Sequence, residues 1–186
     1  MKAFMDEDFL LNNQTAQALY HGTAEALPIL DYHCHISPKE IAENKPLGNI
    51  SKVWLGGDHY KWRVMRASGV PEQNITGDGS DWEKFSAFAA ALPNMVGNPI
   101  YHWSHMELKR GFGIDTVLNA ANAKSIYDRC NEQLADMTPR DIMRKFRVKG
   151  ICTTDDPADD LRYHRQLRDD PSMDILVLPA FRPDKA

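Results

Sequence analysis

Three short apolar runs, each turning polar at its carboxyl end, set the strongest limit on how this chain can fold. They are residues 29 to 33, 148 to 153 and 175 to 178, and each is followed within a few residues by His, Asp or Arg. Runs of this length and composition predict buried strands. Helical sequence separates them, which is typical of parallel β/α units, whose chemistry gathers at the carboxyl ends of the strands.

The segment between the first two predicted strands, residues 40 to 147, is expected to be helical. Ser80 and Glu83 form a capping box that opens an apolar stripe with a period near 3.6 residues. Residues 101 to 110 predict another helix, closed by Gly111. No part of the segment shows the alternation of a half-buried strand.

Two shorter helices are predicted beside the strands. Ser37, Pro38 and Glu40 have the spacing of a capping box directly after the first strand. Residues 159 to 168 are expected to form a surface helix, in an Asp-rich stretch that is most simply a solvated face.

Composition excludes several functional classes. With 22 Lys and Arg against 26 Asp and Glu, the net charge of -4 argues against a nucleic-acid binder. No apolar run approaches the ~20 residues of a membrane span. The first eight residues lack a secretory signal, and three cysteines do not make a disulfide framework, so a cytoplasmic location is expected.

His33 and His35 are the first candidate site. Residues i and i+2 on a strand face the same side, so the two imidazoles could converge on one metal ion while Cys34 points into packing. The spacing is common enough by chance that the residues alone leave two interpretations equally open: a metal site, or two structural histidines.

His59 and Tyr60 form a second candidate, within a segment that also holds Gly56, Gly57 and Arg63. Tyrosine can donate or accept a proton, although its ordinary pKa near 10 must fall for it to act as a base. The alternative interpretation is a helix N-terminus capped by Asp58. The residues alone favour neither.

For two other groups the residues favour a structural role. His102 and His105, spaced i, i+3 among apolar neighbours, fit packing or surface positions better than a metal site. Arg182 follows the third strand and could hold a substrate carboxylate through a bidentate pair. Without further information, a salt bridge with Asp184 is the favoured interpretation of that arginine.

Four separated motifs occur together, at residues 31 to 35 (DYHCH), 54 to 63 (WLGGDHYKWR), 152 to 157 (CTTDDP) and 181 to 185 (FRPDK). In this order they resemble the N-terminal part of the uronate isomerase family, also called glucuronate isomerase. The resemblance spans nearly the whole chain. Four motifs in the right order are far more specific than any one of them.

The resemblance implies an α/β fold, the N-terminal part of a (β/α)₈ (TIM) barrel of the amidohydrolase superfamily, with a large, mainly helical insertion after the first strand. On that basis residues 1–39 hold a lead and the first barrel strand, 40–147 the insertion, and 148–186 the second and third strands. A complete barrel needs about 250 residues, so we expect the N-terminal portion of a longer enzyme.

The resemblance also implies an activity, a metal-associated aldose–ketose isomerisation that interconverts D-glucuronate with D-fructuronate and D-galacturonate with D-tagaturonate. His33 and His35 become ligands of a divalent metal, typically zinc. Tyr60 and His59 become catalytic residues, and Arg182 binds the substrate carboxylate. The implied partner is a small hexuronate, with no nucleic acid or membrane, and a homo-oligomer is compatible with it.

The family's remaining metal ligand, an Asp on the last barrel strand, lies outside these 186 residues, so the chain alone is expected to be inactive. Two alternatives from other classes stay open. One is a metal-dependent hydrolase of the amidohydrolase superfamily, in which bound water attacks an amide or ester. The other is a non-catalytic interaction module built from the helical segment.

Overall fold

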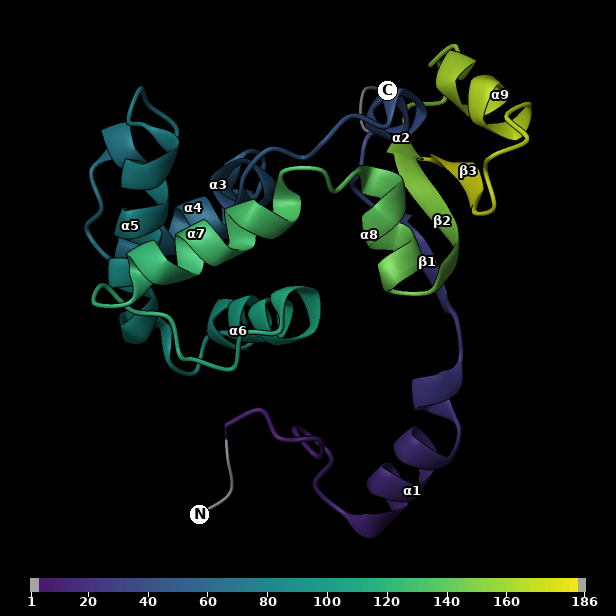
Figure 1. The fold of residues 1–186 in the computed structure, drawn as a ribbon. Helices are drawn as coiled ribbons and strands as arrows, with labels where there is room; N and C mark the ends of the chain where they lie inside the picture. Colours follow the sequence, from purple (N-terminus) through teal and green to yellow (C-terminus); the bar gives the residue numbers. More distant parts are fainter. Residues whose placement is uncertain (1–3, 184–186) are drawn as a thin grey trace. The chain divides into compact units, whose positions relative to one another are not determined.

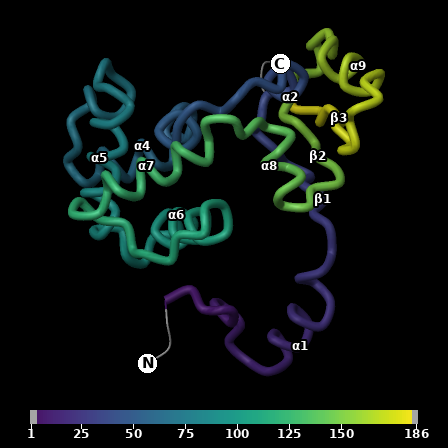
Figure 2. Tube along the Cα trace, in the orientation of Figure 1, coloured from purple at the N-terminus to yellow at the C-terminus, as the bar shows by residue number. Residues whose placement is uncertain are grey.

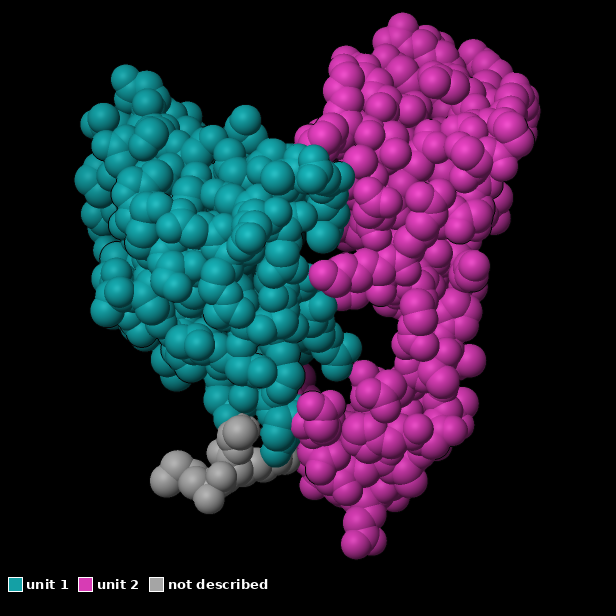
Figure 3. All heavy atoms as spheres, in the orientation of Figure 1, with its two compact units in different colours: residues 1–6, 47–137 teal, residues 7–46, 138–186 magenta. Residues whose placement is uncertain are grey.

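The computed structural model describes residues 4 to 183, shown in Figure 1. The chain forms two compact units, coloured separately in Figure 3. Unit 1 comprises residues 1–6 and 47–137, and unit 2 comprises residues 7–46 and 138–186. The division into residues 1–39, 40–147 and 148–186 stays a prediction.

Unit 2 is an α/β structure built on three parallel strands. Its elements are α1 (Gln14–Gly22), η1 (Ala24–Ala26), β1 (Ile29–Cys34), α2 (Pro38–Glu43), α8 (Pro139–Lys145), β2 (Val148–Asp155), α9 (Arg162–Arg168) and β3 (Leu176–Phe181). The strands lie side by side in the order β1-β2-β3, although β1 and β2 are far apart in sequence (Figure 2). The three predicted parallel strands are therefore confirmed.

The strands extend further toward their polar ends than the sequence predicts. β2 continues to Asp155, which pairs with Phe181 at the end of β3, and Cys34 at the end of β1 pairs with Thr153. Polar residues can pair in these strands because the hydrogen bonds join main-chain N–H and C=O groups, and every residue except proline has both. The β2–β3 pairing is consequently continuous to the polar ends, whereas the β1–β2 register shifts between Asp31 and Cys34.

One side of this sheet is covered and the other is open. The covered side packs into a core with α2, α8 and α9, formed by Cys34, Ile41, Met143, Ile151, Leu167, Ile175 and Val177. The opposite side leaves Leu30, Tyr32, Leu176 and Leu178 exposed, with 73% of Leu30 and 86% of Tyr32 accessible. Large apolar side chains on a sheet face are typical of a surface that another layer covers.

Unit 1 is helical. Its elements are α3 (Ile50–Leu55), α4 (His59–Ala67), η2 (Glu72–Asn74), α5 (Asp81–Ala91), η3 (Leu92–Met95), α6 (Pro99–Phe112) and α7 (Ala123–Leu134). Residues 40 to 147, all within the described part of the chain, contain no strand, which confirms that prediction. The capping box of α5 is present, and Trp54 stacks on Phe85 with ring centroids 6.0 Å apart in the core.

Two helix boundaries and one helix cap differ from the sequence prediction. α6 runs through Gly111 to Phe112 and is closed by Gly113, because Gly113 adopts the left-handed conformation at φ +65° that glycine tolerates. α9 begins only at Arg162, because the Asp156 and Asp160 carboxylates accept from the N–H groups two residues on, those of Ala158 and of Arg162 itself, and so favour turns before the helix. At α2 the Ser37 hydroxyl accepts from the Lys39 amide, not from the Glu40 amide that a capping box uses.

Gly113→Ala is expected to lower the free energy of unfolding by about 1 kcal/mol, because a Cβ is unfavourable at positive φ. Chemical denaturation followed by circular dichroism measures the effect. Gly22→Ala is the matched control, since Gly22 ends α1 with space around it and without a positive φ. An unchanged midpoint for Gly113→Ala would contradict the assignment of the cap.

Candidate active site at the carboxyl edge of the sheet

The carboxyl ends of the three parallel strands bring the predicted site residues of unit 2 to one edge of the sheet. His33 lies near the end of β1 and His35 just beyond it, while Arg182 directly follows β3. β2 separates the two outer strands, so at about 4.8 Å per strand their ends lie about 10 Å apart. The edge therefore carries an imidazole pair on one side and a guanidinium on the other.

The two imidazoles converge. The Nε2 atoms of His33 and His35 are 3.0 Å apart, and the rings meet edge to face with centroids at 4.8 Å. The Asp31 carboxylate accepts a bond from the His33 main-chain N–H at 3.1 Å, which fixes the strand end. Cys34 points into the core as expected, and burial raises the pKa of its thiol. The thiol is therefore a packing group.

This geometry fits a metal ion. Two nitrogens that each bind zinc at about 2.0–2.1 Å lie about 3.3 Å apart in a tetrahedral arrangement, close to the 3.0 Å between the Nε2 atoms. Among residues 4 to 183, no three His, Cys, Asp or Glu side chains gather to hold a metal. His33 and His35 thus offer two nitrogen atoms, whereas a zinc site normally needs three or more protein ligands.

Arg182 is held at the sheet edge through its main chain. Its N–H donates to the Asp155 carbonyl at 3.1 Å, which continues the β2–β3 pairing one residue beyond Phe181. The residue is exposed, as a group that receives a ligand from solvent must be. The alternative partner Asp184 lies outside the described residues.

His59 and Tyr60 begin α4, in unit 1. The Asp58 carboxylate caps this helix, accepting from the main-chain N–H groups of Tyr60 at 2.9 Å and Lys61 at 3.1 Å. The capping interpretation of Asp58 is therefore confirmed. The His59 and Tyr60 rings are exposed, and their centroids lie 4.7 Å apart. The Arg63 guanidinium carbon lies 5.7 Å from the Tyr60 ring centroid. Their part in catalysis stays a prediction.

A buried lysine, not predicted from the sequence, supports this helix start. Lys61 is 5% exposed; its Nζ donates to Asp58 at 2.9 Å and lies 5.6 Å from the Trp54 ring. Burial acts to raise the pKa of Asp58, but the ion pair with Lys61 and the capping N–H bonds outweigh it and lower the pKa. These contacts stabilise the first turn of α4, which carries His59 and Tyr60.

His105 is structural, as the sequence favours. Its Nδ1 lies 2.6 Å from the Tyr101 carbonyl, and its Nε2 accepts from the Leu118 N–H at 3.0 Å. The acceptor role of Nε2 places the ring proton on Nδ1. Burial lowers the pKa of this imidazole, which keeps it neutral inside the helical unit.

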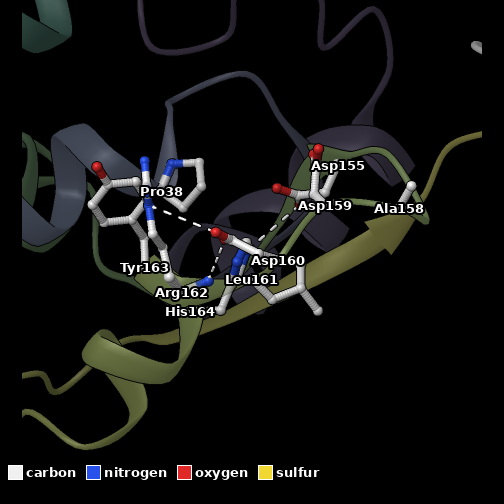
Figure 4. A pocket seen from close by; sticks show the side chains of 9 residues that line it. All are labelled: Pro38, Asp155, Ala158, Asp159, Asp160, Leu161, Arg162, Tyr163 and His164. Carbon is white, nitrogen blue, oxygen red and sulfur yellow. Dashed lines mark hydrogen bonds and ion pairs between the residues drawn. The ribbon is translucent and has the colours of Figure 1, made fainter.

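A second cluster that the sequence does not reveal lies under the carboxyl edge, formed by Thr153, Asp155 and His164. Figure 4 shows the adjoining pocket of about 380 Å³, lined by Pro38, Asp155, Ala158, Asp159, Asp160, Leu161, Arg162, Tyr163 and His164. Alternation along β2 puts Thr153 and Asp155 on one face, but nothing in the sequence marks His164 as their partner.

Comparison with known proteins decides the family. The glucuronate isomerase family profile matches residues 1–186. The chain belongs to this family. A uronate isomerase of Caldicellulosiruptor saccharolyticus is 58% identical over 185 residues, covering 100% of this chain and 40% of that protein. One of Clostridium acetobutylicum is 57% identical with the same coverage.

Solved structures of the glucuronate isomerase family agree. The uronate isomerase of Thermotoga maritima matches with a TM-score of 0.94 at 40% identity, over 100% of this chain and 41% of that one. The glucuronate isomerase of Caulobacter crescentus matches with a TM-score of 0.87 at 27% identity, over 97% of this chain and 40% of that one. The chain thus spans about 40% of the length of its relatives.

The match confirms the predicted family and an α/β fold with three parallel strands and many helices. Within the described residues, none of the helices has the length and apolar character needed to cross a bilayer.

Proposed function

We propose that the enzyme carrying this chain interconverts hexuronates, D-glucuronate with D-fructuronate and D-galacturonate with D-tagaturonate. The observation that supports this proposal most directly is the carboxyl edge of the sheet, where two imidazoles converge at the end of β1 and an arginine follows β3. A family match over the whole chain supports the reaction class. We also place the enzyme in the cytoplasm.

The same proposal extends to the fold. The three strands are the first three of a (β/α)₈ barrel, and residues 40–147 are an insertion after the first strand. The open apolar face with Leu30 and Tyr32 supports this, because the inner face of such a barrel is covered by side chains of the other strands.

Aldose–ketose isomerisation moves two protons, one from C2 to C1 and one from the C2 hydroxyl to the C1 oxygen. A base takes the proton from C2 of the open-chain aldehyde, and the resulting enediol is reprotonated at C1. A divalent metal held by His33 and His35, zinc by its ligand chemistry, would polarise substrate oxygen and stabilise negative charge.

The chain's own residues supply positioning and proton transfer. Arg182 binds the uronate carboxylate as a planar fork, which orients the carbonyl end toward the imidazole pair on the opposite side of the edge. The Tyr60 hydroxyl is the candidate for moving the proton, with His59 beside it at a ring separation of 4.7 Å.

The deciding experiment is a product assay on the full-length enzyme. Incubation with D-glucuronate should give D-fructuronate, an isomer formed without water. Release of an acid or amine from an amide or ester would instead indicate the hydrolase alternative. Lack of turnover by the full-length enzyme would favour a non-catalytic module.

Arg182→Lys should raise KM for D-glucuronate about tenfold in the full-length enzyme, because lysine lacks the fork that matches a carboxylate. Arg165→Lys, on the exposed side of α9, is the matched control and should leave KM within twofold. Steady-state kinetics measure both. Equal effects on KM at the two positions would show that Arg182 does not bind the substrate.

A further inference from the structure

A buried hydroxyl, imidazole and carboxylate form one connected network under the carboxyl edge. The Thr153 Oγ1 donates to Asp155 Oδ2 at 2.6 Å and lies 2.7 Å from His164 Nε2, while His164 Nε2 and Asp155 Oδ2 are 3.5 Å apart. Thr153 is fully buried, and Asp155 and His164 are each 7% exposed. These buried polar groups therefore satisfy one another.

The positions of the protons decide which group of the network donates and which accepts. A threonine hydroxyl has one proton, and the shortest contact assigns it to Asp155. The 2.7 Å contact to His164 is then a bond from Nε2–H to the hydroxyl oxygen. The chain of donors runs from His164 through Thr153 to Asp155. Removing the hydroxyl therefore leaves the buried His164 donor and the buried Asp155 carboxylate with only the longer 3.5 Å contact between them.

The network does not have the arrangement of a nucleophilic triad. There the base contacts both the nucleophile and the acid, whereas here the Thr153 hydroxyl itself contacts the Asp155 carboxylate at 2.6 Å. Thr153 is also 0% exposed, so its oxygen cannot meet a substrate. The network acts on the edge through the main chain.

Asp155 connects the network to Arg182. Its side chain is held by Thr153, and its carbonyl accepts the Arg182 N–H at 3.1 Å. Thr153 also lies 3.2 Å from the Leu178 carbonyl and pairs with Cys34, the residue between the two site histidines. The network thus fixes β2 where it meets the ends of both outer strands.

We infer that the Thr153–Asp155–His164 network positions Arg182 for the substrate carboxylate. The inference rests on the proposed function, because Arg182 has this ligand only in a uronate isomerase. His164 contributes from α9, across the loop of residues 156–161, so the network also anchors that helix to β2. Thr153, Asp155 and His164 are positioning residues, since none of them contacts the substrate.

The test compares Thr153→Val with Thr153→Ser in the full-length enzyme. Valine keeps the shape and removes the hydroxyl, whereas serine keeps the hydroxyl. We expect Thr153→Val to raise KM for D-glucuronate about tenfold with kcat changed less than threefold, and Thr153→Ser to restore KM. Thr138→Ala is the control, because it removes a helix cap in the same unit away from the network.

Two further readouts separate positioning from general destabilisation. Hydrogen exchange of the Arg182 amide, which bonds to the Asp155 carbonyl, should be faster in Thr153→Val than in Thr138→Ala. The effects of Thr153→Val and Arg182→Lys on KM should be less than multiplicative when combined. If Thr153→Val does not fold, His164→Gln and His164→Leu replace it in the same assays. His164→Gln keeps a terminal N–H donor, so it should show a lower KM and slower exchange of the Arg182 amide than His164→Leu.

The outcomes are distinct. Thr153→Val matching Thr138→Ala in KM and in exchange, or multiplying fully with Arg182→Lys, would overturn the positioning role. A wild-type enzyme that does not isomerise uronates would overturn the proposed function and with it the substrate role of the network. The exchange measurement needs no activity, so it reports by itself whether the network holds the Arg182 main chain.

Discussion

His33→Ala in the full-length enzyme should abolish tight metal binding and lower kcat by at least about 100-fold. Loss of a residue that only orients a ligand costs about 10–100-fold in metal affinity or activity, and loss of a ligand itself should cost more. The 3.0 Å approach of the two Nε2 atoms makes the pair act as a unit, so His35→Ala should have a similar effect.

Metal content by mass spectrometry and steady-state kinetics check this expectation. The control is His21→Ala, which removes an exposed imidazole that bonds to Asp8 and Glu25. Its metal content and kcat should stay at the wild-type level. If His33→Ala also keeps both, the two histidines are structural and the metal assignment is wrong.

The predictable part of the fold is the part set by local sequence. The period of the apolar stripe and the Ser80–Glu83 box mark α5 because helix starts and inner faces follow near-neighbour spacing. Strand positions follow from apolar runs in the same way. Where a helix ends is less certain: Gly111 and Gly113 are both candidates, and only the main-chain angle shows that Gly113 closes α6.

In the candidate site too, the features set by local sequence could be predicted and those set by tertiary packing could not. The His33–His35 pair is visible in the sequence because strand alternation alone puts both on one side. The Thr153–His164 contact joins residues separated by an Asp-rich loop, whose path decides which side chain of α9 reaches β2. The Asp-rich composition favours a solvated face, and His164 and Leu167 are nevertheless buried. Such contacts depend on tertiary packing, which single-sequence patterns do not encode.

The 186-residue chain by itself should not isomerise uronates and should hold zinc weakly. Two imidazoles give an incomplete metal site, since catalytic zinc usually has three protein ligands and a water, and the described residues offer no cluster of three ligands. An assay with D-glucuronate and zinc, together with a calorimetric zinc titration, checks both expectations. Turnover near that of the intact enzyme, or tight stoichiometric zinc binding by the monomer, would contradict the assignment of a ligand outside these residues.

The same chain should also self-associate, because Leu30, Tyr32, Leu176 and Leu178 expose an apolar sheet face and β1 and β3 are the outer strands of the sheet. Sedimentation velocity over a range of concentrations measures this association. Tyr32→Lys should reduce it, since a charge would then stand on the exposed apolar face, at its β1 side. Val96→Lys is the control, because Val96 is an exposed apolar residue of the helical unit. A chain that stays monomeric at every concentration would show that this face needs no cover.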